Sequence, residues 1–259
     1  MENNASIQSA MENGYDLDIM NYFSKAWELF KQNPGGYIGY IILFFIISMV
    51  VGMIPFLGFI IGIIVSPALA VGIALAAHRH KNHNEVEFGN FFKGFDYIGQ
   101  LIVAYIIMLV IYFILALPLI FYFGITIFTS IGSGDPEAAF DTVNQIASLG
   151  GWLILYMGVF LYVGVSFRWT YYFIVFHKYD AVSAIKASWK IINKKWLSHF
   201  LFILACVGVG LIGVIALVIG LVVAYPIIMM ADYEGYADVT GLNRSHDVID
   251  EIGMDADLV

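Results

Sequence analysis

Residues 163–196, VGVSFRWTYYFIVFHKYDAVSAIKASWKIINKKW, decide how this chain folds. The stretch begins inside an apolar run in which Arg168 is the only charge. It then becomes an amphipathic helix whose apolar residues recur at steps of three and four, the period of an α-helix. It therefore joins an arginine inside the membrane to a basic helix along the membrane surface. The apolar face is Val182, Ile185, Trp189, Ile192 and Trp196, and the opposite face is Ser183, Lys186, Lys190 and Lys194.

The composition places the chain among membrane proteins. Of its 259 residues, 61% are hydrophobic and only 12% are charged, whereas soluble domains carry about 25% charged residues. Residues 37–77, 98–130 and 197–231 contain no Asp, Glu, Lys or Arg. Because one transmembrane helix needs roughly 20 apolar residues, we predict an all-α, polytopic membrane protein with about six transmembrane helices and amphipathic helices on the cytoplasmic side.

These patterns divide the chain into a mobile acidic tail (1–17), a single transmembrane domain (18–231) and a solvated acidic tail (232–259). Residues 197–231 form either two short spans or a hairpin that does not fully cross, and 98–130 is one tilted helix kinked at Pro118. The predicted interfacial helices are 18–33, 84–97 and 180–196. The predicted spans are 37–52, 57–78, 98–130, 149–176, 197–213 and 214–231.

Small residues in the second span recur every four residues and predict a helix-packing face. Small side chains let another helix backbone approach closely in a membrane, although a lipid-facing row with no packing role is the alternative. The first row is Gly58, Gly62, Ser66, Ala70 and Ala74, and a second row is Ala68, Gly72 and Ala76.

The basic residues predict the topology. With six spans, one side of the membrane receives the N-terminal tail, 79–97, 177–196 and the C-terminal tail, and these segments hold eleven of the twelve Lys and Arg residues. The loop 131–148 on the other side holds none. The positive-inside rule then places both termini in the cytoplasm. We expect no cleavable signal peptide, because the first 35 residues lack an apolar core segment near the start.

Residues 18–78 and 180–231 resemble each other in organisation. Each is an amphipathic helix followed by an apolar hairpin with a proline in its second arm, Pro67 in one and Pro226 in the other. Asp18 and Asp180 are expected to cap the two amphipathic helices. Both units begin in the cytoplasm, so the repeat is parallel.

Residues that could carry chemistry are few. His78, His80 and His83, with Glu85 and Glu87, do not match a structural zinc pattern, and Cys206 is the only cysteine. There is no Gly-rich phosphate loop and no Gly-x-Ser-x-Gly elbow. We therefore expect a protein that is not an enzyme, with no metal and no cofactor.

The pattern of Arg168, Ala184, Ala187-Ser188-Trp189-Lys190 and Trp196 resembles the YciC-like bacterial six-helix integral membrane proteins. Those proteins are similar to the membrane domain of some glycerophosphoryl diester phosphodiesterases. The resemblance implies a multi-pass protein of the bacterial inner (plasma) membrane whose function is unsettled. It implies no phosphodiesterase activity, since the chain has no soluble segment long enough for that domain.

Two functions fit these features. The first is a non-enzymatic scaffold or accessory subunit that docks a membrane-protein partner or a second copy, and the second is a transporter or lipid-handling protein. In the second, Arg168 meets an anionic headgroup or substrate, because no Asp or Glu at membrane depth is placed to pair with it. Backbone carbonyls or the hydroxyls of Ser166 or Tyr171 are the other acceptors, and an arginine that snorkels and only anchors the cytoplasmic end of its span is the alternative. We expect membrane lipids as partners and no nucleic acid. The candidate lipid- or partner-binding residues are Arg168, Ser188, Trp189, Lys190 and Trp196.

Overall fold

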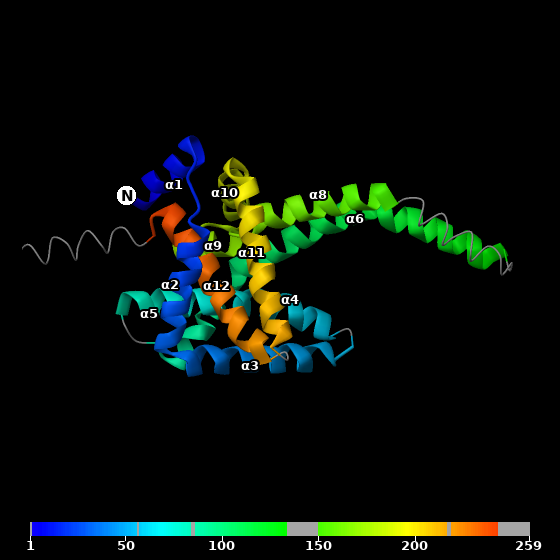
Figure 1. Ribbon diagram of the computed structural model, residues 1–259. Helices are drawn as coiled ribbons and strands as arrows, with labels where there is room; N and C mark the ends of the chain where they lie inside the picture. Colours follow the sequence, from blue (N-terminus) through cyan, green and yellow to red (C-terminus); the bar gives the residue numbers. More distant parts are fainter. Residues whose placement is uncertain (1, 56, 84–85, 134–149, 217–218, 243–259) are drawn as a thin grey trace, which may run out of the picture. The chain divides into compact units, whose positions relative to one another are not determined.

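The protein is an all-α membrane protein. The computed structural model describes residues 2–55, 57–83, 86–133, 150–216 and 219–242, and these contain helices and turns but no strand (Figure 1). The helices are α1 (Glu2–Asn13), α2 (Ile19–Gln32), α3 (Pro34–Gly52), α4 (Leu57–Ala70), α5 (Gly72–His83), η1 (Phe88–Tyr97), α6 (Ile98–Ser133), α8 (Gly150–Phe167), α9 (Thr170–His177), α10 (Ala181–Lys194), α11 (Trp196–Ile215) and α12 (Ile219–Thr240).

Among the residues that the structure describes, five helical segments are long and apolar enough to cross a membrane. Two of the predicted spans are each built from two helices: the second breaks at Val71 between α4 and α5, and the fourth breaks at Arg168 and Trp169 between α8 and α9. The predicted sixth span, 214–231, includes residues 217–218, which lie outside the described part of the chain, as does most of the predicted loop 131–148. The five segments are Pro34–Gly52, Leu57–His83, Phe88–Thr126, Gly150–His177 and Trp196–Ile215.

The chain forms two compact units, which we describe separately. The first comprises Met1–Ala104 and Ser166–Val259, and the second comprises Tyr105–Val165. In the first unit, α12 packs against α2, α11 and α5 (Figure 1).

Aspartate caps begin both predicted amphipathic helices. The Asp18 carboxylate accepts a hydrogen bond from the Asn21 backbone N–H, and Asp180 accepts from those of Val182 and Ser183. Such caps satisfy backbone donors that the first turn of a helix leaves without partners. The hydrogen bonds from the Ser183 side chain and backbone hold the pKa of Asp180 below its usual value. The sequence-based N-terminal boundaries of α2 and α10 are therefore confirmed.

The buried face of α10 coincides only in part with the predicted one. Ile185 and Ile192 are buried as predicted, but Val182 and Trp189 are exposed, and the small residues Ala184 and Ser188 are completely buried. The small side chains allow α10 to approach α9 closely, and α10 and α9 are in contact. The lysine face is exposed as expected. The prediction failed at Val182 and Trp189 because side-chain size, and not only hydrophobicity, decides which face packs.

Both predicted tails contain ordered, packed segments. Residues 2–13 form α1, whose Ile7 and Ala10 are buried. Residues 232–240 continue α12 instead of forming a solvated tail, and Asp232 and Glu234 are buried. Glu234 pairs with Lys81 at 2.9 Å. The exposed Asp238, one turn further along α12, accepts a hydrogen bond of 2.6 Å from the Tyr22 hydroxyl. Residues 243–259 lie outside the described residues.

Within the chain, the second small-residue row is packed more tightly than the first. Ala68, Gly72 and Ala76 are buried, and a Cβ on Gly72 would lie 2.3 Å from the Phe91 carbonyl oxygen. In the first row, Gly58 contacts the end of α3 and Ala74 is buried, but no atom lies within 4 Å of a Cβ placed on Gly62, and Ser66 is exposed. The row that faces η1 is therefore the one that packs.

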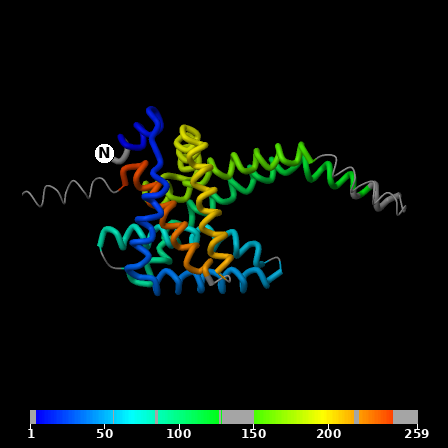
Figure 2. The backbone as a smooth tube through the Cα atoms, viewed as in Figure 1, coloured from blue at the N-terminus to red at the C-terminus, as the bar shows by residue number. Residues whose placement is uncertain are grey.

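The second unit is a pair of helices formed by α6 and α8 (Figure 2). Tyr112 and Phe160 stack with their ring centroids 5.9 Å apart, and the Tyr156 hydroxyl donates a hydrogen bond to the Leu115 carbonyl. Large apolar side chains cover the remaining surface of the pair. The most exposed are Phe121, Ile125, Phe128, Trp152, Ile154, Leu155 and Met157.

Candidate functional site

The candidate site lies where the helix that carries Arg168 breaks. Helix α8 ends at Phe167 and α9 begins at Thr170. Ser188 of α10 bridges the break: its hydroxyl donates to the Ser166 carbonyl at 2.8 Å and accepts from the Trp169 backbone N–H at 3.2 Å. Backbone groups freed by a break must find partners when they are buried. Ser188 therefore has a structural role as the group that satisfies this break.

Arg168 has an acidic partner, contrary to the sequence-based expectation. Its Nε lies 2.9 Å from Oδ1 of Asp232 on α12, and both side chains are largely buried. The same carboxylate oxygen accepts a hydrogen bond of 3.0 Å from the Trp169 indole N–H. The interpretation of Arg168 as unpaired was wrong because Asp232, assigned to the solvated tail, belongs to a buried helix.

Aromatic rings surround the guanidinium group. Its central carbon lies 4.4 Å from the Phe202 ring centroid and 5.2 Å from that of Trp169, distances at which a cation is attracted to the face of a ring. Within the described residues, Nη1 and Nη2 of Arg168 are buried and have no hydrogen-bond partner. The group is thus held at one edge and leaves two donor nitrogens unused.

A set of aromatic and hydrogen-bond contacts around His199 lies beside the ion pair of Arg168 and Asp232. Trp169 packs edge-on against His199, with 4.6 Å between the ring centroids. The Tyr15 hydroxyl lies 2.6 Å from His199 Nε2 and donates to the Ile191 carbonyl at 3.1 Å. The hydroxyl has one proton, so it accepts from Nε2 when it donates to the Ile191 carbonyl, and the direction of the contact with His199 depends on the tautomer of that ring. Burial raises the pKa of Tyr15 above its ordinary value, so this hydroxyl keeps its proton at neutral pH.

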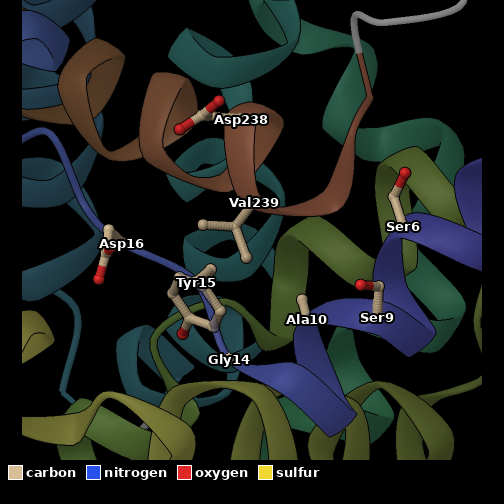
Figure 3. Close-up of a pocket in the computed structure, with 8 residues that line it drawn as sticks. All are labelled: Ser6, Ser9, Ala10, Gly14, Tyr15, Asp16, Asp238 and Val239. Carbon is tan, nitrogen blue, oxygen red and sulfur yellow. The ribbon is translucent and has the colours of Figure 1, made fainter.

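A polar cavity of about 270 Å³ lies between α1 and the end of α12 (Figure 3). Tyr15, Asp16 and Asp238 line it, together with Ser6 and Ser9. Arg168 lines neither this cavity nor the cavities lined by α5 with η1 and by α9 with the start of α6. The structure therefore does not open Arg168 to any of these three cavities.

The other predicted site residues do not join the cluster around Arg168. Trp189 lies on the surface with its ring tilted against Phe167, and Lys190 is exposed. Trp196 stacks on Phe200, with their ring centroids 5.4 Å apart. In the predicted histidine loop, His78 and His80 lie against the hydroxyls of Tyr233 and Tyr37. Of the five predicted binding residues, only Arg168 and Ser188 are brought together, through Trp169.

Sequence reasoning missed five members of the cluster: Tyr15, Trp169, His199, Phe202 and Asp232. One signal was present, because Asp232 is the first charged residue after the charge-free run 197–231. An acid at that position lies at the boundary of a span, where it can turn inward to a buried cation.

We compared the chain with family models, with curated proteins and with solved structures. No family model, curated protein or solved structure matches it. The resemblance of the stretch 168–196 to the YciC-like group remains a prediction, and the function is inferred from geometry alone.

Proposed function

We propose that the protein is a non-enzymatic membrane scaffold or accessory subunit that docks a helix of a membrane partner on its α6–α8 pair. The observation that carries the proposal is a pair of glycines on the exposed side of α8. Gly151 and Gly158 are seven residues apart, two helical turns, and no atom lies within 4 Å of a Cβ placed on either. Lipid solvates large apolar side chains well, so close packing at small residues is what favours helix association in a membrane.

The state of Arg168 supports docking over transport. Its Nε is paired with Asp232, rings cover its guanidinium, and it lines none of the three described cavities. A substrate pathway calls for a polar route to the charge. The buried ion pair of Arg168 and Asp232 fits a structural role inside a helix bundle that supports a docking surface.

Site-specific photo-crosslinking in cells tests the docking surface. A photoreactive residue at Phe113 or Met157, both exposed on the pair, should give a discrete protein adduct. The adduct should be lost in the Gly158→Leu variant, because an isobutyl group holds the partner helix away. Gly208→Leu is the matched control, since Gly208 of α11 is equally free of contacts. Adducts that persist in Gly158→Leu, or no protein adduct at either position, would overturn the proposal.

The alternative function is lipid handling through Arg168, and one observation favours it. Nη1 and Nη2 are buried donors without partners among the described residues, and a guanidinium fork suits a phosphate. If a lipid phosphate occupies these donors, Arg168→Lys should lose co-purifying anionic lipid nearly as completely as Arg168→Leu. Retention of that lipid by Arg168→Lys would leave only the ion pair with Asp232.

We further propose that the protein lies in a bacterial inner membrane, as its resemblance to the YciC-like group implies, with both termini in the cytoplasm, as the charge distribution predicts. The test replaces Cys206 by alanine and introduces single cysteines at Ser133 and Lys194. An impermeant thiol reagent should label Ser133→Cys in intact cells and Lys194→Cys only after lysis. The reverse labelling would invert the orientation.

A further inference from the structure

A second cavity, of about 230 Å³, lies at the polar end of α5, where η1 packs against it. Its volume is below the roughly 300–1,000 Å³ of pockets for drug-sized ligands, so it suits a small chemical group. The residues that give it its character are Arg79 and His83 of α5, and Asn90, Lys93 and Asp96 of η1. None of them belongs to the cluster around Arg168.

The cationic groups of this cavity are largely uncommitted. Arg79 has no ion pair or hydrogen bond to any described residue. Lys93 and Asp96 are 3.7 Å apart and both are more than half exposed, so water screens their attraction strongly. The cavity thus keeps a net positive charge at its rim, with one carboxylate beside it.

Asn90 supplies an independent observation. It is one of the residues that line the cavity, it is only 5% exposed, and its Nδ2 has no hydrogen-bond partner among the described residues. Buried polar groups are nearly always hydrogen-bonded. An amide donor without a partner needs an oxygen acceptor, and the two cations that line the same cavity favour an anionic one.

The surroundings indicate where that oxygen comes from. Phe88 and Phe95 of η1 expose their rings beside the cavity-lining residues of the same helix. Aromatic rings of this kind settle at the level of lipid headgroups. The cavity also lies at the charged end of Leu57–His83, a segment long and apolar enough to span the membrane. The donors therefore sit where lipid phosphates are concentrated.

We propose that this cavity binds the phosphate group of an anionic lipid, with Asn90 Nδ2 and the side chains of Arg79 and Lys93 as donors. The guanidinium can meet two phosphate oxygens at once, and the amide can donate to one of them. This proposal does not depend on docking at the α6–α8 pair, which lies in the other compact unit.

Thermal unfolding of the full-length protein, in nanodiscs of phosphatidylcholine with or without phosphatidylglycerol, tests the proposal. Phosphatidylglycerol should raise the unfolding temperature of the parent, and Arg79→Gln and Lys93→Gln should each require about tenfold more of it for the same shift. Asn90→Asp, which replaces the donor by a negative charge, should abolish the shift. Lys186→Gln, which removes an exposed lysine of α10, should behave like the parent.

A parallel titration in neutral detergent with inorganic phosphate separates the two sources of the group. Protection by inorganic phosphate that the same three variants weaken would support a phosphate site open to free anions. Protection by the lipid alone would support a headgroup site. An equal loss in Lys186→Gln would mean diffuse attraction to an anionic surface and would overturn the proposal. Absence of any shift in the parent would overturn it too.

Discussion

The two parts of the chain that resemble each other in sequence organisation are followed by helix ends of opposite charge. In the first, α5 ends with Arg79, Lys81 and His83; in the second, α12 ends with Asp232, Glu234 and Asp238. The two ends meet, since Lys81 pairs with Glu234 and the Tyr233 hydroxyl lies 2.7 Å from His78. The ends of α5 and α12 are thus complementary in charge.

The acids buried at the end of α12 are paired, whereas Asp238 at that end and Arg79 at the basic end of α5 line cavities. Asp232, Glu234 and Asp238 each have a partner, namely Arg168, Lys81 and Tyr22. On the basic end, Arg79 has none within the described residues, and it lines a cavity. In this fold, a buried charge is paired with a neighbouring side chain, whereas an exposed charge without a described partner can meet a ligand.

Removing one member of the buried pair should have the largest effect. Asp232→Ala leaves the Arg168 guanidinium buried without its carboxylate, and breaking such a pair costs about 3–5 kcal/mol of unfolding free energy. Thermal and denaturant unfolding in mild detergent would measure it. The Arg168→Leu and Asp232→Leu double variant should recover much of the loss, because no uncompensated charge remains. A double variant worse than both single variants would contradict the interpretation of this pair as structural.

Gly94 should be far less tolerant than Gly62. A Cβ on Gly94 would lie 2.0 Å from the Ala68 carbonyl oxygen, whereas a Cβ on Gly62 meets nothing within 4 Å. Overpacking of this kind costs about 1–3 kcal/mol and sometimes more, so Gly94→Ala should lower the unfolding temperature and Gly62→Ala should not. Equal unfolding temperatures would show that η1 can move away from α4 without cost.

Ser188→Ala should lower the unfolding free energy by about 1–3 kcal/mol. The buried Trp169 N–H loses the Ser188 hydroxyl as an acceptor, and the Ser166 carbonyl loses it as a donor. Ser66→Ala, at an exposed position of α4, is the matched control. Denaturant unfolding of both variants would measure the difference in their unfolding free energy. A Ser188→Ala variant as stable as the control would mean that water bridges the break.

The smallest effect concerns Asp180 and depends on pH. Since hydrogen bonds in the folded state lower the pKa of its carboxyl, the carboxylate stabilises α10 above the unfolded-state pKa of about 4, and this contribution is lost as the pH falls through the folded-state value. Asp180→Asn should keep the cap and remove that part of the acid dependence. Asp180→Ala should lose the cap at every pH. An unchanged acid profile in Asp180→Asn would exclude Asp180 as its source.

The sequence by itself determined the class of fold and most of the helices. Charge-free runs must be helical in a membrane, because only intrahelical hydrogen bonds satisfy the backbone there, and Asp18 and Asp180 begin their helices where their capping chemistry requires. The residue type also made Arg168 stand out, since a charge in an apolar run is costly.

Only the tertiary structure decided what each of these residues contacts. Asp232 reaches Arg168 from a helix 64 positions further along the chain, and hydropathy alone assigned it to a tail. Likewise, two small-residue rows had equal periodicity, and the position of η1 chose the row of Ala68 and Gly72. The physical reason is the same in both cases: a periodic pattern fixes which residues share a helix face, but the free energy of burying that face depends on the neighbour that covers it.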